Sequence, residues 1–122
     1  NNNQCIIKGP VPHHKMIEYI SRSKIMFLLS KSEGLSLPVI EAIHHNTVPI
    51  VLKNGITEKL TDQKILPALD ADSKVTTIIE RAMEVLSDQD LRHRVIKQNL
   101  HLNSKFLNEH QILTENFLQK FS

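Results

Sequence analysis

Short apolar runs alternate with amphipathic stretches along the first half of the chain. The runs at 4–8, 24–29 and 48–52 are short and rich in β-branched or aromatic residues, which is typical of buried strands. Between them, 13–23 and 37–45 carry apolar residues near helical spacing and are predicted to be helices. Strands that alternate with helices predict an α/β domain with a parallel sheet and helices on its two faces.

The second half of the chain is predicted to be mostly helical, beginning with a single turn at 57–60. Asp72-Ser73 can cap a long helix that runs through Leu86. The apolar residues of this helix share one face and are Val75, Ile78, Ile79, Ala82, Met83 and Leu86. Ser87-Asp88 opens a further helix with an inward face of Leu91, Val95, Ile96 and Leu100. A last helix is predicted over 108–121 and completes a helical C-terminal tail.

The connection between the strand at 24–29 and the next helix carries a glutamate at either end. Seven residues separate Glu33 from Glu41. Gly34 can adopt backbone angles closed to other residues, so a ligand can approach the main chain there. Pro38 suits the first turn of a helix, where its missing N–H is not needed. Strand, glycine loop and helix start together leave main-chain N–H groups unpaired at one sheet edge, and such groups attract phosphate.

The stretch Ser32-Glu33-Gly34-Leu35-Ser36-Leu37-Pro38-Val39-Ile40-Glu41-Ala42, followed by Val48-Pro49-Ile50-Val51, resembles a signature of the retaining nucleotide-sugar glycosyltransferases of group 1 (family 4). These enzymes have the two-lobed GT-B fold. The resemblance implies a three-layer, Rossmann-like parallel sheet. It also implies that residues 1–122 form a single donor-binding domain, the later part of the C-terminal lobe of a longer enzyme. The N-terminal lobe would then be a partner from the same protein.

The resemblance also implies roles for individual residues. Glu33 and Glu41 take the places of the two family glutamates, against the donor sugar and the ribose respectively. The main chain at Gly34, Leu35, Ser36 and Leu37 would face the sugar and its diphosphate. Gly9, Val11 and His13 match positions that border the nucleotide base, although an ordinary strand-to-helix turn explains these three residues equally well.

Two departures from the family pattern are visible in the sequence. Asn46 stands where the family usually has glycine, and asparagine is the next-best tolerated residue at a left-handed helix cap. The segment 61–69 lacks the glycines that family members usually have there, so no function is assigned to it. Lys31 is the only cation identified near the glutamate loop, and the family's phosphate clamp is expected upstream of this chain.

Composition narrows the classes of function. The formal net charge of +2, the absence of tryptophan and the single tyrosine argue against nucleic-acid binding. One cysteine, Cys5, excludes an internal disulfide framework and suits a reducing cytoplasm. No apolar stretch approaches the length of a membrane helix. The histidine pairs lack zinc-type spacing, so neither a metal nor another cofactor is expected beyond the donor itself.

The resemblance implies a glycosyltransferase of the hexosyl or N-acetylhexosaminyl type, with a UDP- or GDP-sugar donor and a saccharide or lipid-linked acceptor. Bacterial surface polysaccharide synthesis (O-antigen, capsule or lipopolysaccharide) at the inner face of the membrane is the expected setting, with possible peripheral membrane association of the full-length enzyme. The isolated chain is expected to be inactive because the acceptor lobe is missing. The alternative is a non-catalytic α/β module that binds a nucleotide or a protein. A glycosidase fits less well, because both glutamates belong to one loop-helix unit.

Overall fold

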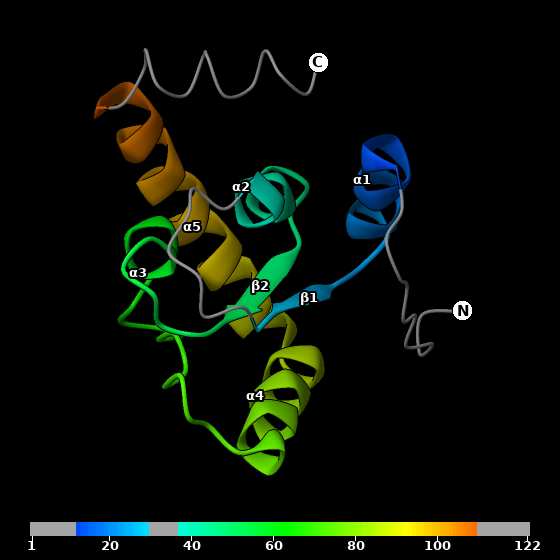
Figure 1. Ribbon diagram of the computed structural model, residues 1–122, viewed down its shortest axis with the longest axis vertical. Helices are drawn as coiled ribbons and strands as arrows, with labels where there is room; N and C mark the ends of the chain where they lie inside the picture. Colours follow the sequence, from blue (N-terminus) through cyan, green and yellow to red (C-terminus); the bar gives the residue numbers. More distant parts are fainter. Residues whose placement is uncertain (1–11, 30–36, 110–122) are drawn as a thin grey trace.

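A computed structural model describes residues 12–29 and 37–109 (Figure 1). Two parallel strands, β1 (Ile25–Leu28) and β2 (Val48–Val51), pair in register from Ile25 opposite Val48 to Leu28 opposite Val51. A parallel bridge between Leu52 and Leu69 extends the sheet beyond β2. The strands predicted at 24–29 and 48–52 are confirmed, whereas the one predicted at 4–8 lies outside the described residues.

Within the described residues, five helices surround the strands, and the order of elements is α1, β1, α2, β2, α3, α4, α5. Their bounds are α1 His13–Ser21, α2 Leu37–His44, α3 Thr57–Leu60, α4 Val75–Ser87 and α5 Gln89–Glu109. Each corresponds to a helix predicted from the sequence. The last predicted helix, at 108–121, lies outside the described residues except for its first two positions, which continue α5.

Local chemistry explains where these helices begin and end. Asn46 has a φ of 61°, the left-handed conformation expected of an asparagine at a helix C-terminus. Asp88 caps α5, because its Oδ1 accepts the N–H of Leu91 at 3.0 Å. The predicted cap of α4 was wrong: its N-cap is Lys74, in an extended conformation and with no side-chain capping bond. Asp72 and Ser73 lie outside the helix because they belong to a turn in which the Ser73 N–H donates to the carbonyl of Asp70 at 3.0 Å.

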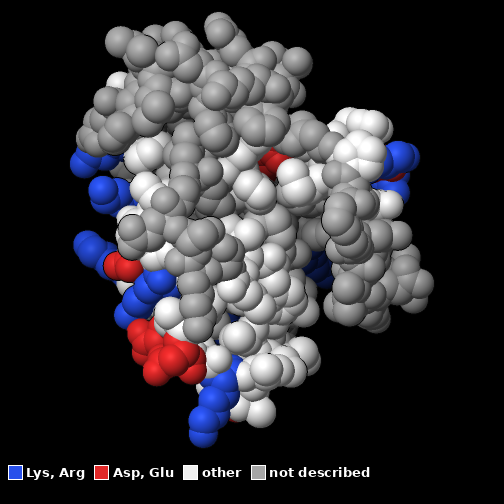
Figure 2. Space-filling view, viewed as in Figure 1, with Lys and Arg blue, Asp and Glu red and all other residues white. Residues whose placement is uncertain are grey.

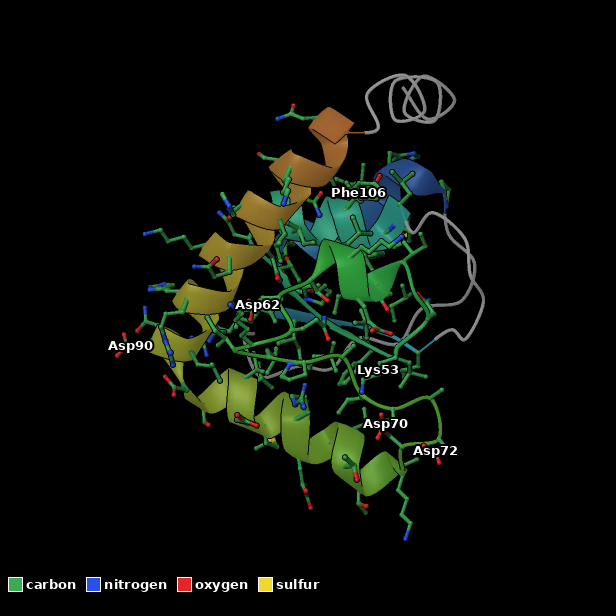
Figure 3. All side chains as sticks on the ribbon, turned by 90° about the vertical axis from the view of Figure 1, so that its left-hand side faces the viewer. Lys53, Asp62, Asp70, Asp72, Asp90 and Phe106 are labelled. Atoms are coloured by element: carbon green, nitrogen blue, oxygen red, sulfur yellow. The ribbon has the colours of Figure 1, made fainter. Side chains whose placement is uncertain are left out.

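Helices cover both faces of the sheet, so the predicted α/β architecture is confirmed. On one face, Met26, Leu28 and Val51 pack against apolar side chains of α2, chiefly Val39, Ile40 and Ile43. The opposite face of β2 packs against α4 and the start of α5, through Val48, Ile50, Ala82, Val85, Leu91 and Val95. Helix α5 is long enough to reach both sides, and near its far end Phe106 joins the α2 cluster (Figure 3).

The apolar face predicted for α4 is only partly buried. Ala82 and Val85 point into the core, but Val75, Ile79 and Met83 are 69, 53 and 59% exposed. Phe27 on the neighbouring strand β1 is also exposed, and the middle of the face seen in Figure 2, over β1 and the adjoining part of α4, is largely uncharged. Large contiguous apolar areas are a feature of surfaces that contact another protein or another part of the same protein. We call these four residues and Leu86 the α4 apolar surface.

The segment 61–69, to which the sequence assigned no function, has a defined structure. Asp62 is buried, and its Oδ2 accepts the main-chain N–H groups of Lys64 and Ile65. Its own N–H donates to Oδ1 of Asn99 on α5 at 2.8 Å. The Ala68 N–H donates to the side-chain oxygen of Gln63 at 3.0 Å. These bonds place Leu69 beside β2 without any glycine.

Candidate functional site

The candidate site is the sheet edge at which β1 and β2 both end. Because the strands are parallel, their carboxyl ends meet at one edge, and open α/β sheets bind ligands beyond that edge. The chain leaves β1 into residues 30–36 and re-enters the described structure at Leu37, the first residue of α2. It leaves β2 through Leu52 into Lys53 and the turn that follows.

Most of the residues predicted to bind the donor lie outside the described structure. Glu33, Gly34, Leu35, Ser36, Gly9 and Val11 belong to this group. His13 is the first residue of α1, and nothing of its side chain is described. The structure therefore places two of the predicted residues, Leu37 and Glu41, in full.

Leu37 offers only its main chain to a ligand. Its side chain is 5% exposed and belongs to the buried face of α2. The first N–H groups of a helix have no partner within the helix and carry its positive dipole end. The role of Leu37 as a main-chain donor stays a prediction, and a substitution of its buried side chain would act through the core.

Glu41 lies at the start of the second turn of α2. It is the fifth residue of the helix, and the first turn contains no acidic residue. The sequence predicted a helix that starts near residue 37 with Glu41 in its first turn. The helix does start at Leu37, but its first turn ends at Ile40, so the first-turn placement of Glu41 was wrong by one residue. Its flanking residues Ile40 and Ala42 are buried, while Glu41 itself is half-buried with its Oε2 inside the protein. Such a carboxylate can accept hydrogen bonds from ligand hydroxyls in a partly dry setting, where they are stronger than in water.

A second cation, Lys53, lies at the same edge and was missed by the sequence reasoning. Its Nζ is 3.1 Å from Oδ1 of Asp70, and Figure 3 shows the two side chains facing each other, with Asp72 nearby. Both partners are largely exposed, so the pair contributes less than about 1 kcal/mol to stability. The sequence contained a clue to this residue. Lys53 directly follows the strand predicted at 48–52, and the residue after a strand lies at the carboxyl edge of the sheet.

The turn after β2 is held by side-chain hydrogen bonds. Oδ1 of Asn54 accepts the N–H groups of Ile56 and Thr57, at 3.2 and 2.9 Å. The buried Thr57 hydroxyl donates to the carbonyl of Leu52 at 2.7 Å. Gly55 has a φ of 83°, the positive φ that glycine supplies in an Asn-Gly turn. The loop that borders the site is therefore a fixed structure.

Histidines and acidic residues form no other centre in the part of the chain that the structure describes. His14, His44, His45, His93 and His101 are exposed, as expected for surface histidines. Within residues 12–29 and 37–109, no three His, Cys, Asp or Glu side chains gather as a metal site would require. None of the described helices is long and apolar enough to cross a membrane.

Taken together, the parallel strands and the helices on both faces define an α/β domain, and open α/β sheets bind ligands beyond the carboxyl ends of their strands, the edge at which α2 begins. The family model of the glycosyl transferases group 1 matches residues 1–101, and the chain belongs to this family. Enzymes of the family use nucleotide-sugar donors and transfer the sugar to an acceptor. Neither the comparison with curated proteins nor that with solved structures gives a significant match.

Proposed function

We propose that this chain is the donor-binding domain of a retaining glycosyltransferase that moves a hexosyl or N-acetylhexosaminyl group from a UDP- or GDP-sugar to a saccharide or lipid-linked acceptor. The observation that carries the proposal is the half-buried carboxylate of Glu41, held on the helix that follows β1 at the carboxyl edge of a family domain.

In this proposal Glu41 accepts hydrogen bonds from the two ribose hydroxyls. Glu33 holds the hydroxyls of the donor sugar, and main-chain N–H groups from Gly34 to Leu37 face the diphosphate. Such donors stabilise the negative charge that grows on the leaving diphosphate as the glycosidic bond breaks. The base side of the pocket is formed by Gly9, Val11 and His13. No protein nucleophile and no bound metal is assigned.

The proposal includes the rest of the enzyme. Residues 1–122 form the later part of a donor lobe, and the α4 apolar surface is covered by the remainder of that lobe. Support comes from the exposure of Val75, Ile79 and Met83 on a helix whose other side is in the core. The acceptor lobe supplies the second substrate, and the expected process is assembly of bacterial surface polysaccharide at the cytoplasmic face of the membrane.

The test is a titration of the 122-residue chain with UDP, GDP and their sugar conjugates, followed by amide shifts in NMR spectra. One nucleotide should bind, with shifts in α2 and in the turn at 53–55. Glu41→Gln keeps the size of the side chain but removes its charge. Charge-assisted hydrogen bonds contribute about 1.5–3 kcal/mol each, so loss of one weakens binding by at least about tenfold.

Glu84→Ala is the matched control, because Glu84 is an exposed glutamate on α4, on the other side of the sheet. It should leave nucleotide affinity unchanged. If the wild type and Glu41→Gln bind the nucleotide with equal affinity, Glu41 does not bind the ribose. That result would favour a module that binds a nucleotide without transferring a sugar. Turnover by the full-length enzyme then separates transfer from simple binding, since only a transferase loses product formation in Glu41→Gln.

A further inference from the structure

A basic cavity lies at the opposite end of the sheet from the proposed donor site. Its volume is about 400 Å³, and its walls come from the end of α1, the start of β1, the turn between α2 and β2, and the first turns of α5. The lining residues are Ser21, Arg22, Ser23, Lys24, His45, Asn46, Arg92, His93 and Ile96. A strand of four residues spans about 13 Å, so β1 separates this cavity from the carboxyl edge.

The side chains that line the cavity are cationic or neutral, and none is a carboxylate. Arg22, Lys24 and Arg92 supply three positive charges from three different elements. The nearest ion pair among the described residues joins Nη2 of Arg22 to Glu18 at 3.0 Å, and Glu18 is shared with Lys15 at 3.5 Å. No described carboxylate pairs with Lys24 or with Arg92. Cations gathered in this way repel one another until an anion is bound.

Arg92 is held in the cavity wall by two hydrogen bonds from one nitrogen of its guanidinium. Its Nη1 donates to the carbonyls of Val85 and Leu86 at the end of α4, at 3.0 and 2.6 Å. Among the described residues, Arg92 donates side-chain hydrogen bonds only from Nη1. The guanidinium has donors on all three nitrogens in a fixed fork that matches the oxygens of a phosphate, so Nε and Nη2 remain to bind one.

The C-terminal ends of α1 and α2 explain part of the clustering of positive charge here, because the carbonyl groups at a helix C-terminus favour nearby cations. They do not account for Arg92, which enters from the first turn of α5. The turn that carries His45 and Asn46 is attached to the end of α1. The buried Thr47, which follows this turn, donates from its Oγ1 to the carbonyls of Ile20 and Ser23 at 2.6 and 3.0 Å. The cavity is thus formed by a rigid junction of α1, β1 and α2.

We propose that this cavity binds a phosphate ester, with Lys24 and Arg92 as the principal contacts. The ester belongs either to a small phosphorylated metabolite or to the headgroup of an anionic lipid. This site is independent of the donor site, because none of its lining residues lies at the carboxyl edge of the sheet. Its failure in the test below leaves the proposed glycosyl transfer unaffected.

The first arm of the test titrates the 122-residue chain with glycerol 3-phosphate and follows the amide signals of 21–24, 45–46 and 92–93. These signals should shift together and saturate. Lys24→Ala should weaken binding at least fivefold, because Lys24 is exposed and its loss removes one of three cations without disturbing the core. Lys64→Ala removes an exposed lysine elsewhere on the surface and should leave the affinity unchanged.

The second arm distinguishes the two sources of phosphate. Vesicles of phosphatidylglycerol should sediment with the wild-type chain and much less with Lys24→Ala if the ligand is a headgroup, while phosphatidylcholine vesicles should not bind. Binding of glycerol 3-phosphate without binding to vesicles identifies a free metabolite. Three outcomes would each overturn the proposal. The amide shifts could be confined to α2 and the turn at 53–55, Lys24→Ala and Lys64→Ala could weaken binding equally, or the chain could respond to neither probe.

Discussion

Replacement of Asn99 by alanine is expected to destabilise the protein by about 2 kcal/mol. The side chain of Asn99 is 2% exposed, and its Oδ1 accepts the main-chain N–H of Asp62, which is itself buried. Alanine leaves that N–H in the interior without an acceptor, and an unsatisfied buried donor costs about 1–3 kcal/mol. The same bond fixes the start of the 61–69 segment, which leads to the bridge at Leu69 and to Asp70 at the ligand edge.

Urea unfolding followed by circular dichroism measures this cost. Gln98→Ala is the matched control, because Gln98 is the adjacent residue on α5 and is exposed, so its loss should change stability by less than about 0.5 kcal/mol. Hydrogen exchange gives a second readout: the Asp62 amide should be protected in the wild type and exchange faster in Asn99→Ala. If Asn99→Ala loses no more stability than Gln98→Ala, the Asp62 N–H has another acceptor and the reasoning is refuted.

Four further outcomes follow from the described contacts and exposures. Asn46→Ala should cost about 1 kcal/mol because alanine is strained at a φ of 61°, whereas Asn46→Gly should be neutral or stabilising in the same urea assay. Thr47→Val keeps the shape of a buried side chain but loses the hydroxyl that donates to Ile20, and should cost about 1 kcal/mol; an unchanged midpoint would contradict the bond. Ile43→Ala opens a core cavity and should cost about 2–5 kcal/mol. Ile79→Lys, on the α4 apolar surface, should leave the stability of the isolated chain nearly unchanged and reduce its self-association in light scattering.

The local pattern of the sequence was enough to predict the elements and their order. Strands β1 and β2 are short β-branched runs, and helices α1 to α5 follow from apolar spacing and turn residues that act within a few positions. Asn46, Gly55 and Asp88 are examples: each acts on backbone within three residues of itself, so its effect is readable without knowledge of the fold. Family membership was also readable, because the Glu33 to Glu41 stretch carries several residue types in one fixed order.

Long-range contacts decided what the pattern left open. The apolar residues of α4 lie on one stretch of helix, but whether each is buried depends on what packs there, and in this chain Val85 is in the core while Val75 is exposed. The start of the 61–69 segment is attached to α5 by the hydrogen bond that the Asp62 N–H donates to Oδ1 of Asn99, 37 positions away, and no local rule reveals this bond.

Local sequence thus determined the elements of the predicted donor site, the motif that contains Glu41 and the membership of the glycosyl transferases group 1. Tertiary structure alone decided which charges share a surface. Lys53 and Asp70 meet at one sheet edge, and Arg22, Lys24 and Arg92 meet at the other, because a parallel sheet gathers the ends of distant segments. Electrostatic interactions depend on distance in space, and spacing along the chain does not specify that distance once helices and crossovers intervene.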